Sequence, residues 1–275
     1  MKELSFEEAK KVELNILLHI SDFCKKNNLR YFLAYGTLIG AVRHNGFIPW
    51  DDDIDINMSR KDYNWLIANY NKMNPNGRYR LISPYDKEAK HSFVKIIDTF
   101  TMKIEKGIDY KEGYLGVDID IFPLDGQPDS NIKFNCWYNQ LARLYRIHII
   151  CQLDKEISIK TKIAVPLLRF LYKGGRTALK KAEKLHKKYP YENSKYIGAV
   201  ECLFDSKDNR CLKEWFDYPI EAEFEGHLLW IPCGYDKILT QIYGDYMQLP
   251  PVEQQVSHHQ NKMYLITEEN VDETI

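Results

Sequence analysis

The run Trp50–Met58, WDDDIDINM, constrains the fold most strongly. It places four aspartates at positions 51, 52, 53 and 55. Like charges this close repel one another, and burial raises the cost. Yet from Asp53 to Met58 acidic or polar residues alternate with apolar ones, which is typical of a strand with one buried face. Pro49 ends any preceding helix. The pattern therefore predicts a strand of a packed sheet that carries carboxylates on its other face.

The aspartate run has two explanations that involve no nucleotide. An EF-hand calcium loop would run from Asp51 to Asp62, but its sixth position requires glycine and is Ile56 here. A solvated acidic turn is the other, since runs of charge are usually solvated. Apolar residues at every second position argue against it, because they hold the run against a packed core.

A divalent-metal site accounts for the whole pattern. Asp53 and Asp55, two residues apart on a strand, project from the same face. Mg²⁺, with Mn²⁺ as the alternative, takes hard oxygen ligands and commonly binds one or two carboxylates together with phosphate oxygens and water. Such an ion would offset the repulsion, and one or two ions would suit phosphoryl chemistry on a nucleotide.

Two other segments support this hypothesis. Gly36-Thr37 follows a predicted strand, Arg30–Tyr35, and precedes a predicted short helix. Backbone N–H groups at a helix N-terminus can approach a phosphate, especially beside a small residue. Asp118 and Asp120 alternate with apolar residues in GVDIDIFPLDG, so a further carboxylate can reach the metal from a neighbouring strand. The combination indicates a nucleotidyltransferase fold.

The order of elements predicts an α/β fold, a nucleotidyltransferase-type mixed sheet flanked by helices. A capping box, Ser5 with Glu8, starts a helix that extends to about Asn27, and Ser59 with Asp62 starts another. Further strands are expected at 79–82, 92–98, 101–105 and 114–122. We therefore expect a catalytic core over residues 1–128.

The sequence pattern of residues 129–275 predicts a largely helical second half that packs on the core. Its helical pattern extends from Ile132 to Tyr189, and a further helix is expected at 235–246. The segment Phe224–Pro232 predicts a strand returning to the sheet. A C-terminal motif follows it.

Composition excludes several classes of protein. The net charge of −1 gives no overall field that would attract nucleic acid. The six cysteines form no C-x-x-C pair, which leaves a zinc ribbon unsupported. The first residues are charged and lack the apolar core of a signal peptide, and no run of about 18 apolar residues could span a bilayer. We expect a reduced, cytoplasmic protein.

The stretch 160–188 contains ten Lys or Arg residues and one acidic residue. A solvated helix face is the ordinary explanation. The alternative is a peripheral contact with anionic lipid on the inner face of the membrane, which would bring the protein to a lipid-linked acceptor.

Four segments resemble the LicD/fukutin family: GTLIGAVRHNGFIPWDDDIDINM, KIIDTFT, GVDIDIFPLDG, and YGDYMQLPP followed by SHH. The resemblance is weakest over 131–220. It implies a nucleotidyltransferase-type fold and transfer of a phosphorylated alcohol, most often phosphocholine from CDP-choline, to a hydroxyl of a cell-surface glycan such as teichoic acid or lipopolysaccharide. Fukutin-like members are associated with CDP-ribitol instead. Ribitol, glycerol and ethanolamine are the alternatives to choline.

The resemblance also implies site residues. The metal-binding aspartates correspond to Asp53 and Asp55, with Asp51 nearby, and the later catalytic aspartate corresponds to Asp120, as a metal ligand or as a base toward the acceptor hydroxyl. Asp118 falls where the family pattern is usually apolar.

The remaining candidates would bind substrate. We expect Gly36 and Thr37 to donate to the diphosphate. Arg43 and Lys95 are candidate phosphate clamps, although ordinary pairing with the many aspartates is an equal alternative. His258 lies in the C-terminal motif and is a candidate for substrate contact. Two rival functions remain: another metal-dependent nucleotidyltransferase acting on a small molecule or sugar phosphate, and a non-catalytic nucleotide-binding protein.

Overall fold

The computed structural model describes residues 1–75, 77–87, 89–105, 116–152, 159–201, 209–257 and 261–266, with the backbone alone at 159–164. Its α-helices are α1 Phe6–Lys26, α2 Tyr35–His44, α3 Arg60–Met73, α4 Asn131–Gln152, α5 Ile159–Leu171, α6 Arg176–His186 and α7 Tyr235–Tyr243. The strands are β1 Lys2–Glu3, β2 Tyr31–Leu33, β3 Asp55–Ser59, β4 Tyr79–Ile82, β5 Val94–Asp98, β6 Thr101–Ile104, β7 Asp118–Gln127, β8 Tyr196–Gly198, β9 Cys211–Leu212, β10 Pro219–Phe224, β11 His227–Pro232 and β12 Lys262–Leu265.

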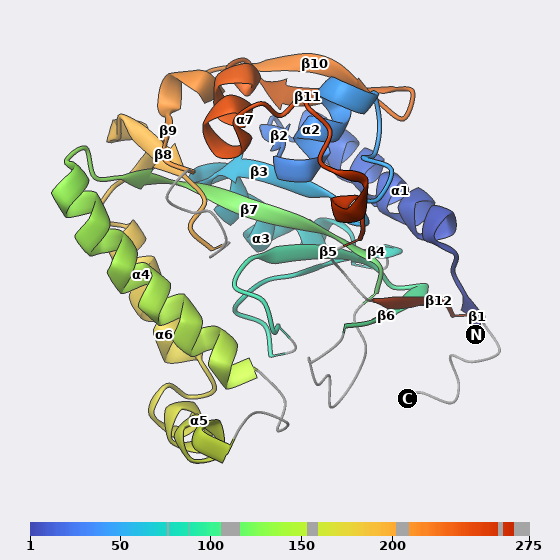
Figure 1. Cartoon of the computed structure of the whole chain (residues 1–275). Coiled ribbons are helices and arrows are strands. Elements are labelled where there is room, and N and C mark those ends of the chain that lie inside the picture. Colours follow the sequence, from blue (N-terminus) through green and yellow to red (C-terminus); the bar gives the residue numbers. More distant parts are fainter. Residues whose placement is uncertain are drawn as a thin grey trace.

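A mixed sheet forms the centre of the molecule, with the order β2-β3-β7-β5-β4 (Figure 1). β3 and β7 are parallel, whereas β2 with β3, β7 with β5, and β5 with β4 are antiparallel. The end of β7 continues into antiparallel pairing with β8, which pairs with β9. The expected α/β fold with a mixed sheet flanked by helices is confirmed.

The alternation in the acidic run separates the two faces of β3. Ile54, Ile56 and Met58 are fully buried and belong to one core cluster with apolar residues of β5, β7, α1, α2 and α3. α1 and α3 lie against the sheet on this side (Figure 1). Because side chains alternate along a strand, Asp55 and Asp120 lie on the opposite face.

Local signals at the helix starts agree with the structure. Ser5 caps α1, and its reciprocal bonds with Glu8 complete the capping box. Ser59 caps α3 and accepts a hydrogen bond from the backbone N–H of Asp62. α2 differs from the expectation, because it begins at Tyr35, one residue before the Gly36-Thr37 pair. That pair therefore lies within the first turn of the helix rather than ahead of it.

The strand boundaries differ in detail from those expected. The strand at 79–82 matches β4, and those at 92–98 and 101–105 correspond to the shorter β5 and β6. β7 begins at Asp118 and extends to Gln127, which is longer than predicted. Residues 106–115, which include the first two residues of the strand expected at 114–122, lie outside the described residues.

The second half is helical over α4, α5 and α6, as predicted, and α7 forms at the expected place. The strand expected at Phe224–Pro232 forms as β11, but its hydrogen-bonded partner is β10, so it is half of a hairpin rather than a strand of the main sheet. The strands that return are β8, which pairs with β7, and β12, which joins β6 and β1. Within the described ranges, no helix has the length and apolar character needed to cross a membrane.

Candidate active site

Asp55 and Asp120 are direct neighbours on parallel strands. They face each other in the register of β3 and β7, and the next strand, β5, places Lys95 opposite Asp120. Asp53 precedes β3, which begins at Asp55, and Asp51 lies in the loop that leads to it. The carboxylates of Asp51, Asp53, Asp55 and Asp120 are partly accessible, whereas Asp52 is buried with 9% exposure. The face therefore presents carboxylates from two strands and from the loop that leads into β3.

The first turn of α2 contacts this loop at two points. The backbone N–H of Asp55 donates to Thr37 Oγ1 across 2.9 Å. A Cβ atom at Gly36 would lie 2.3 Å from Asp51 Oδ2, a separation that leaves no room for a side chain unless Asp51 moves. Glycine and threonine at these positions thus allow the helix start to lie directly against the carboxylates.

The electrostatics of the carboxylates favour a cation. Burial, reinforced by the charges of Asp53 and Asp120, raises the pKa of Asp55 well above its ordinary value. Burial likewise raises the pKa of Asp120 to about 7, although the nearby Lys95 opposes the shift. Within the described part of the chain, the Asp55 carboxylate accepts no hydrogen bond. Hard oxygen ligands with excess negative charge fit a divalent ion such as Mg²⁺.

The carboxylate oxygens nevertheless stand apart from one another. Among the described residues, three potential ligand atoms come within 4.8 Å of one another in one place, at Asp125, His186 and Glu201. The cluster of Asp53, Asp55 and Asp120 does not meet this spacing, and Lys95 Nζ already binds Asp120 Oδ1 at 2.6 Å. A shared ion at the predicted site would therefore require these side chains to rotate.

The set Asp125, His186 and Glu201 could by its spacing hold a divalent ion, but it already contains a cation. Arg60 donates to both oxygens of Asp125, and its Nη2 donates to Glu201 at 2.9 Å. His186 Nδ1 lies 2.9 Å from Asp125 Oδ2. Burial favours the neutral acid, but Arg60 and His186 outweigh it and lower the pKa of Asp125. We interpret this set as an ion-pair cluster that fastens α3, β7 and α6.

The predicted phosphate clamps are both engaged by protein groups. Arg43 donates from Nε to His44 and from Nη1 to the carbonyl oxygen of Tyr246, at 2.9 and 2.5 Å. Lys95 is 4% exposed and binds Asp118 and Asp120. Their phosphate roles remain predictions. His258 lies outside the described residues.

Two buried groups near the cluster are not apparent from motif reading. Lys103 of β6 donates to Asp118 Oδ1 at 2.7 Å. Glu13 of α1 is 1% exposed, and neither of its carboxylate oxygens has a hydrogen-bond partner in the described part of the protein. Burial raises its pKa well above the ordinary value, against the charge of Lys103. An acidic residue within the apolar stripe of α1 is the signal that could have identified Glu13.

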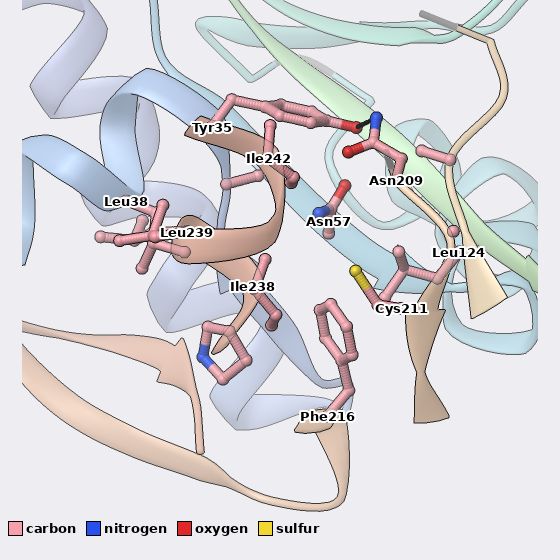
Figure 2. A pocket seen from close by; sticks show the side chains of 15 residues that line it. Tyr35, Leu38, Asn57, Leu124, Asn209, Cys211, Phe216, Ile238, Leu239 and Ile242 are labelled. Carbon is pink, nitrogen blue, oxygen red and sulfur yellow. Dashed lines mark hydrogen bonds between the residues drawn. The ribbon is translucent and has the colours of Figure 1, made fainter. Parts of the chain in front are cut away.

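A small cavity lies on the same sheet face, further along β3 (Figure 2). Asn57 reaches into it, and its Oδ1 has no hydrogen-bond partner in the described chain. Apolar side chains of β7, β9 and α7 form its walls, while Asn209 donates to the hydroxyl of Tyr35. The free volume is about 20 Å³, room for about one water molecule. This cavity cannot contain a nucleotide base in the conformation seen.

The mixed sheet, the carboxylates on β3 and β7, and a helix start against them form the arrangement expected of a nucleotidyltransferase-type domain. The sequence profile of the LicD/FKTN/FKRP nucleotidyltransferase domain matches residues 28–166. The chain belongs to this family.

Similar proteins include the lipopolysaccharide cholinephosphotransferase LicD of Haemophilus influenzae. It is 33% identical over 276 residues, which cover 97% of this chain and all of that protein. An uncharacterized protein of Rickettsia typhi is 40% identical over 63 residues, covering 22% of this chain and 20% of its own length. One from Rickettsia prowazekii is 38% identical over 68 residues, or 22% and 26%. The Haemophilus protein is thus similar along nearly the whole chain, and the other two over a short segment.

Proposed function

We propose that this protein transfers phosphocholine from CDP-choline to a hydroxyl of a cell-surface glycan and releases CMP. The observation that carries the proposal is the placement of Asp55 and Asp120 side by side on β3 and β7, with the first turn of α2 against them. The full-length similarity to a cholinephosphotransferase supports choline as the alcohol and lipopolysaccharide or a related glycan as the acceptor.

Asp53, Asp55 and Asp120 would hold Mg²⁺ or Mn²⁺, with Asp51 beside them. When bound, the ion would neutralise phosphate charge and so make the phosphorus easier to attack. The backbone of Gly36 and Thr37 would meet the diphosphate at the N-terminus of α2, where N–H groups point outward. Catalysis would consist mainly of positioning and charge neutralisation.

In the transfer step, the acceptor hydroxyl oxygen attacks the phosphorus that bears choline. A new P–O bond forms, and the bond from that phosphorus to the bridging oxygen breaks. CMP leaves with the bridging oxygen and its electron pair, and the hydroxyl proton passes to Asp120 or to water.

A screen of CDP-alcohols with Mg²⁺ and a glycan acceptor tests the donor. We expect CMP release to be fastest with CDP-choline and slower with CDP-ribitol, CDP-glycerol and CDP-ethanolamine. Faster CMP release with another CDP-alcohol would identify that alcohol, rather than choline, as the group that the protein transfers. Transfer of a nucleotidyl group from ATP or UTP to a sugar phosphate, with no CMP from any CDP-alcohol, would support the rival nucleotidyltransferase function.

We further propose that α5 and α6 contact anionic lipid, which would bring a lipid-linked acceptor to the enzyme. Leu167, Phe170 and Leu171 of α5 are 58%, 82% and 57% exposed, and α5 lies at an end of the molecule away from the main sheet (Figure 1). Seven exposed basic residues follow in the chain: Lys173, Arg176, Lys180, Lys181, Lys184, Lys187 and Lys188. Apolar insertion combined with basic charge is typical of interfacial helices.

Co-sedimentation with phosphatidylglycerol vesicles at low salt tests this contact. We expect binding by the unmodified protein, loss of binding in Phe170→Glu, and no binding to phosphatidylcholine vesicles. Leu228→Glu is the matched control, because Leu228 is 60% exposed on β11. Equal binding by the two variants, or none by the unmodified protein, would contradict the proposal.

A further inference from the structure

Asp118 is a buried carboxylate whose two oxygens are both occupied by lysines. It is 3% exposed. Its Oδ2 lies 2.5 Å from Lys95 Nζ, and its Oδ1 lies 2.7 Å from Lys103 Nζ. A carboxylate whose two oxygens are both paired with lysines in this way has little capacity left to ligate a metal ion.

Lys95 connects Asp118 to the proposed active site. It lies opposite Asp120 in the pairing of β5 with β7, and its Nζ also donates to Asp120 Oδ1 at 2.6 Å. The same ammonium group therefore binds two carboxylates of one strand face. Only one oxygen of Asp120 is used by this contact, and Oδ2 has no contact with Lys95 among the described interactions.

The other end of this row is also fixed. Lys103 lies 3.7 Å from Glu105 Oε1, and Glu105 Oε2 lies 3.1 Å from His91 Nε2. The side chains of Lys95, Lys103 and Asp118 are at most 7% exposed, and those of Glu105 and His91 are 11% and 21% exposed. Buried pairs with additional hydrogen bonds are held in one geometry more firmly than exposed ones.

We propose that Asp118 is a positioning residue that anchors Lys95, so that Lys95 occupies one oxygen of Asp120 and leaves the other for the metal ion and the substrate. This inference rests on the proposed function in one respect, namely that Asp120 serves the metal. Without Asp118, the charge of Lys95 would be shared with fewer carboxylates and would compete with the ion for Asp120. Outer groups that orient a ligand typically contribute 10- to 100-fold in metal affinity or activity.

Mn²⁺ binding, followed by electron paramagnetic resonance of the full chain without donor or acceptor, gives a readout apart from turnover. The variants are Asp118→Asn, Lys95→Met and the double variant. Asp98→Asn is the control, because Asp98 is a fully buried carboxylate of β5 that is paired with Arg78 and does not contact Asp120. Thermal unfolding of each variant measures any general loss of structure.

We expect Asp118→Asn to weaken Mn²⁺ binding at least 10-fold, and Lys95→Met to bind Mn²⁺ as tightly as the unmodified protein or more tightly. In the Lys95→Met background, Asp118→Asn should change the affinity less than threefold. Asp98→Asn should lower stability without changing Mn²⁺ affinity.

Equal losses of affinity in the two backgrounds would overturn the proposal and identify Asp118 as a ligand. Should Asp118→Asn alone fail to fold, the comparison of Lys95→Met with the double variant decides in the same way. In the double variant only Lys103 loses a carboxylate partner, and it keeps Glu105 at 3.7 Å. An unmodified protein that binds no Mn²⁺ also overturns it. Mn²⁺ binding with this pattern but no CMP release would instead contradict the donor assignment alone.

Discussion

The backbone N–H of Asp55 donates to the hydroxyl of Thr37 across 2.9 Å, and this bond joins the start of β3 to the first turn of α2. Thr37 is 4% exposed, so the bond is shielded from water. It links the two motifs that the sequence separates by 18 residues and fixes the carboxylate strand relative to the proposed phosphate site.

Removing that hydroxyl should destabilise the protein. Thr37→Val keeps the shape but leaves the Asp55 N–H without its acceptor, which costs on the order of 1–3 kcal/mol. Thr37→Ser retains the oxygen and should lose less. Urea unfolding measures both free energies. Equal stability of the Val variant and the unmodified protein would show that water replaces the bond.

Stabilisation by Mg²⁺ should depend on pH through Asp120. The pKa of this group is raised to about 7 by burial, so below that pH a proton competes with the ion for the carboxylate. A raised pKa also means that the metal-free folded state loses stability as pH rises toward that value. The gain in Tm on adding Mg²⁺ should therefore be larger at pH 8 than at pH 6. Asp120→Asn should remove most of this difference, and a gain independent of pH would contradict the assignment.

The ion-pair cluster around Arg60 should contribute strongly to stability. Arg60→Met would leave Asp125 and Glu201, which are 4% and 3% exposed, without their cation, and breaking such a buried pair costs about 3–5 kcal/mol. Chemical denaturation checks the loss. A chelator tests whether this cluster binds a metal ion instead. In Asp55→Asn, which lacks a carboxylate of the proposed metal site, a chelator should leave the Tm unchanged. A lower Tm would mean that an ion binds elsewhere, with Asp125, His186 and Glu201 as the candidate ligands.

Glu13 should make the protein less stable as pH rises. Its pKa is raised well above the ordinary value by burial. The stabilising effect of protonation is complete below about pH 4 and is lost as pH rises toward the folded-state pKa, by about 1.4 kcal/mol per pH unit. Glu13→Gln cannot ionise, so we expect similar stability near pH 5 and higher stability near pH 8. Parallel stability profiles for the two proteins would contradict this account.

Sequence patterns predicted most of the elements that depend on local chemistry. The capping box at Ser5, the cap at Ser59 and the alternation at Ile54, Ile56 and Met58 each follow from neighbouring residues, and all are confirmed. The alternation in the two D-x-D segments also predicted that Asp55 and Asp120 lie on strands, and the pairing of β3 with β7 places them side by side.

The remaining features depend on pairing between distant segments. β11 has the composition of a sheet strand, but its partner is the adjacent β10 rather than the main sheet. The short strands β8 and β12 have too few residues for a periodic signal, yet they pair with β7 and β6. The lysines that hold Asp118 lie 23 and 15 residues away in the chain, and only the fold shows that they converge.

Phosphorus-31 magnetic resonance can follow phosphocholine transfer itself, with CDP-choline, the protein, Mg²⁺ and a lipopolysaccharide acceptor in one sample. We expect the diphosphate signals to be replaced by equal amounts of a CMP monoester signal and a glycan-linked phosphodiester signal. Neither should form with Asp55→Asn or Asp120→Asn. An intact diphosphate signal, or free phosphocholine without a phosphodiester, would contradict the claim that this protein is a phosphocholine transferase.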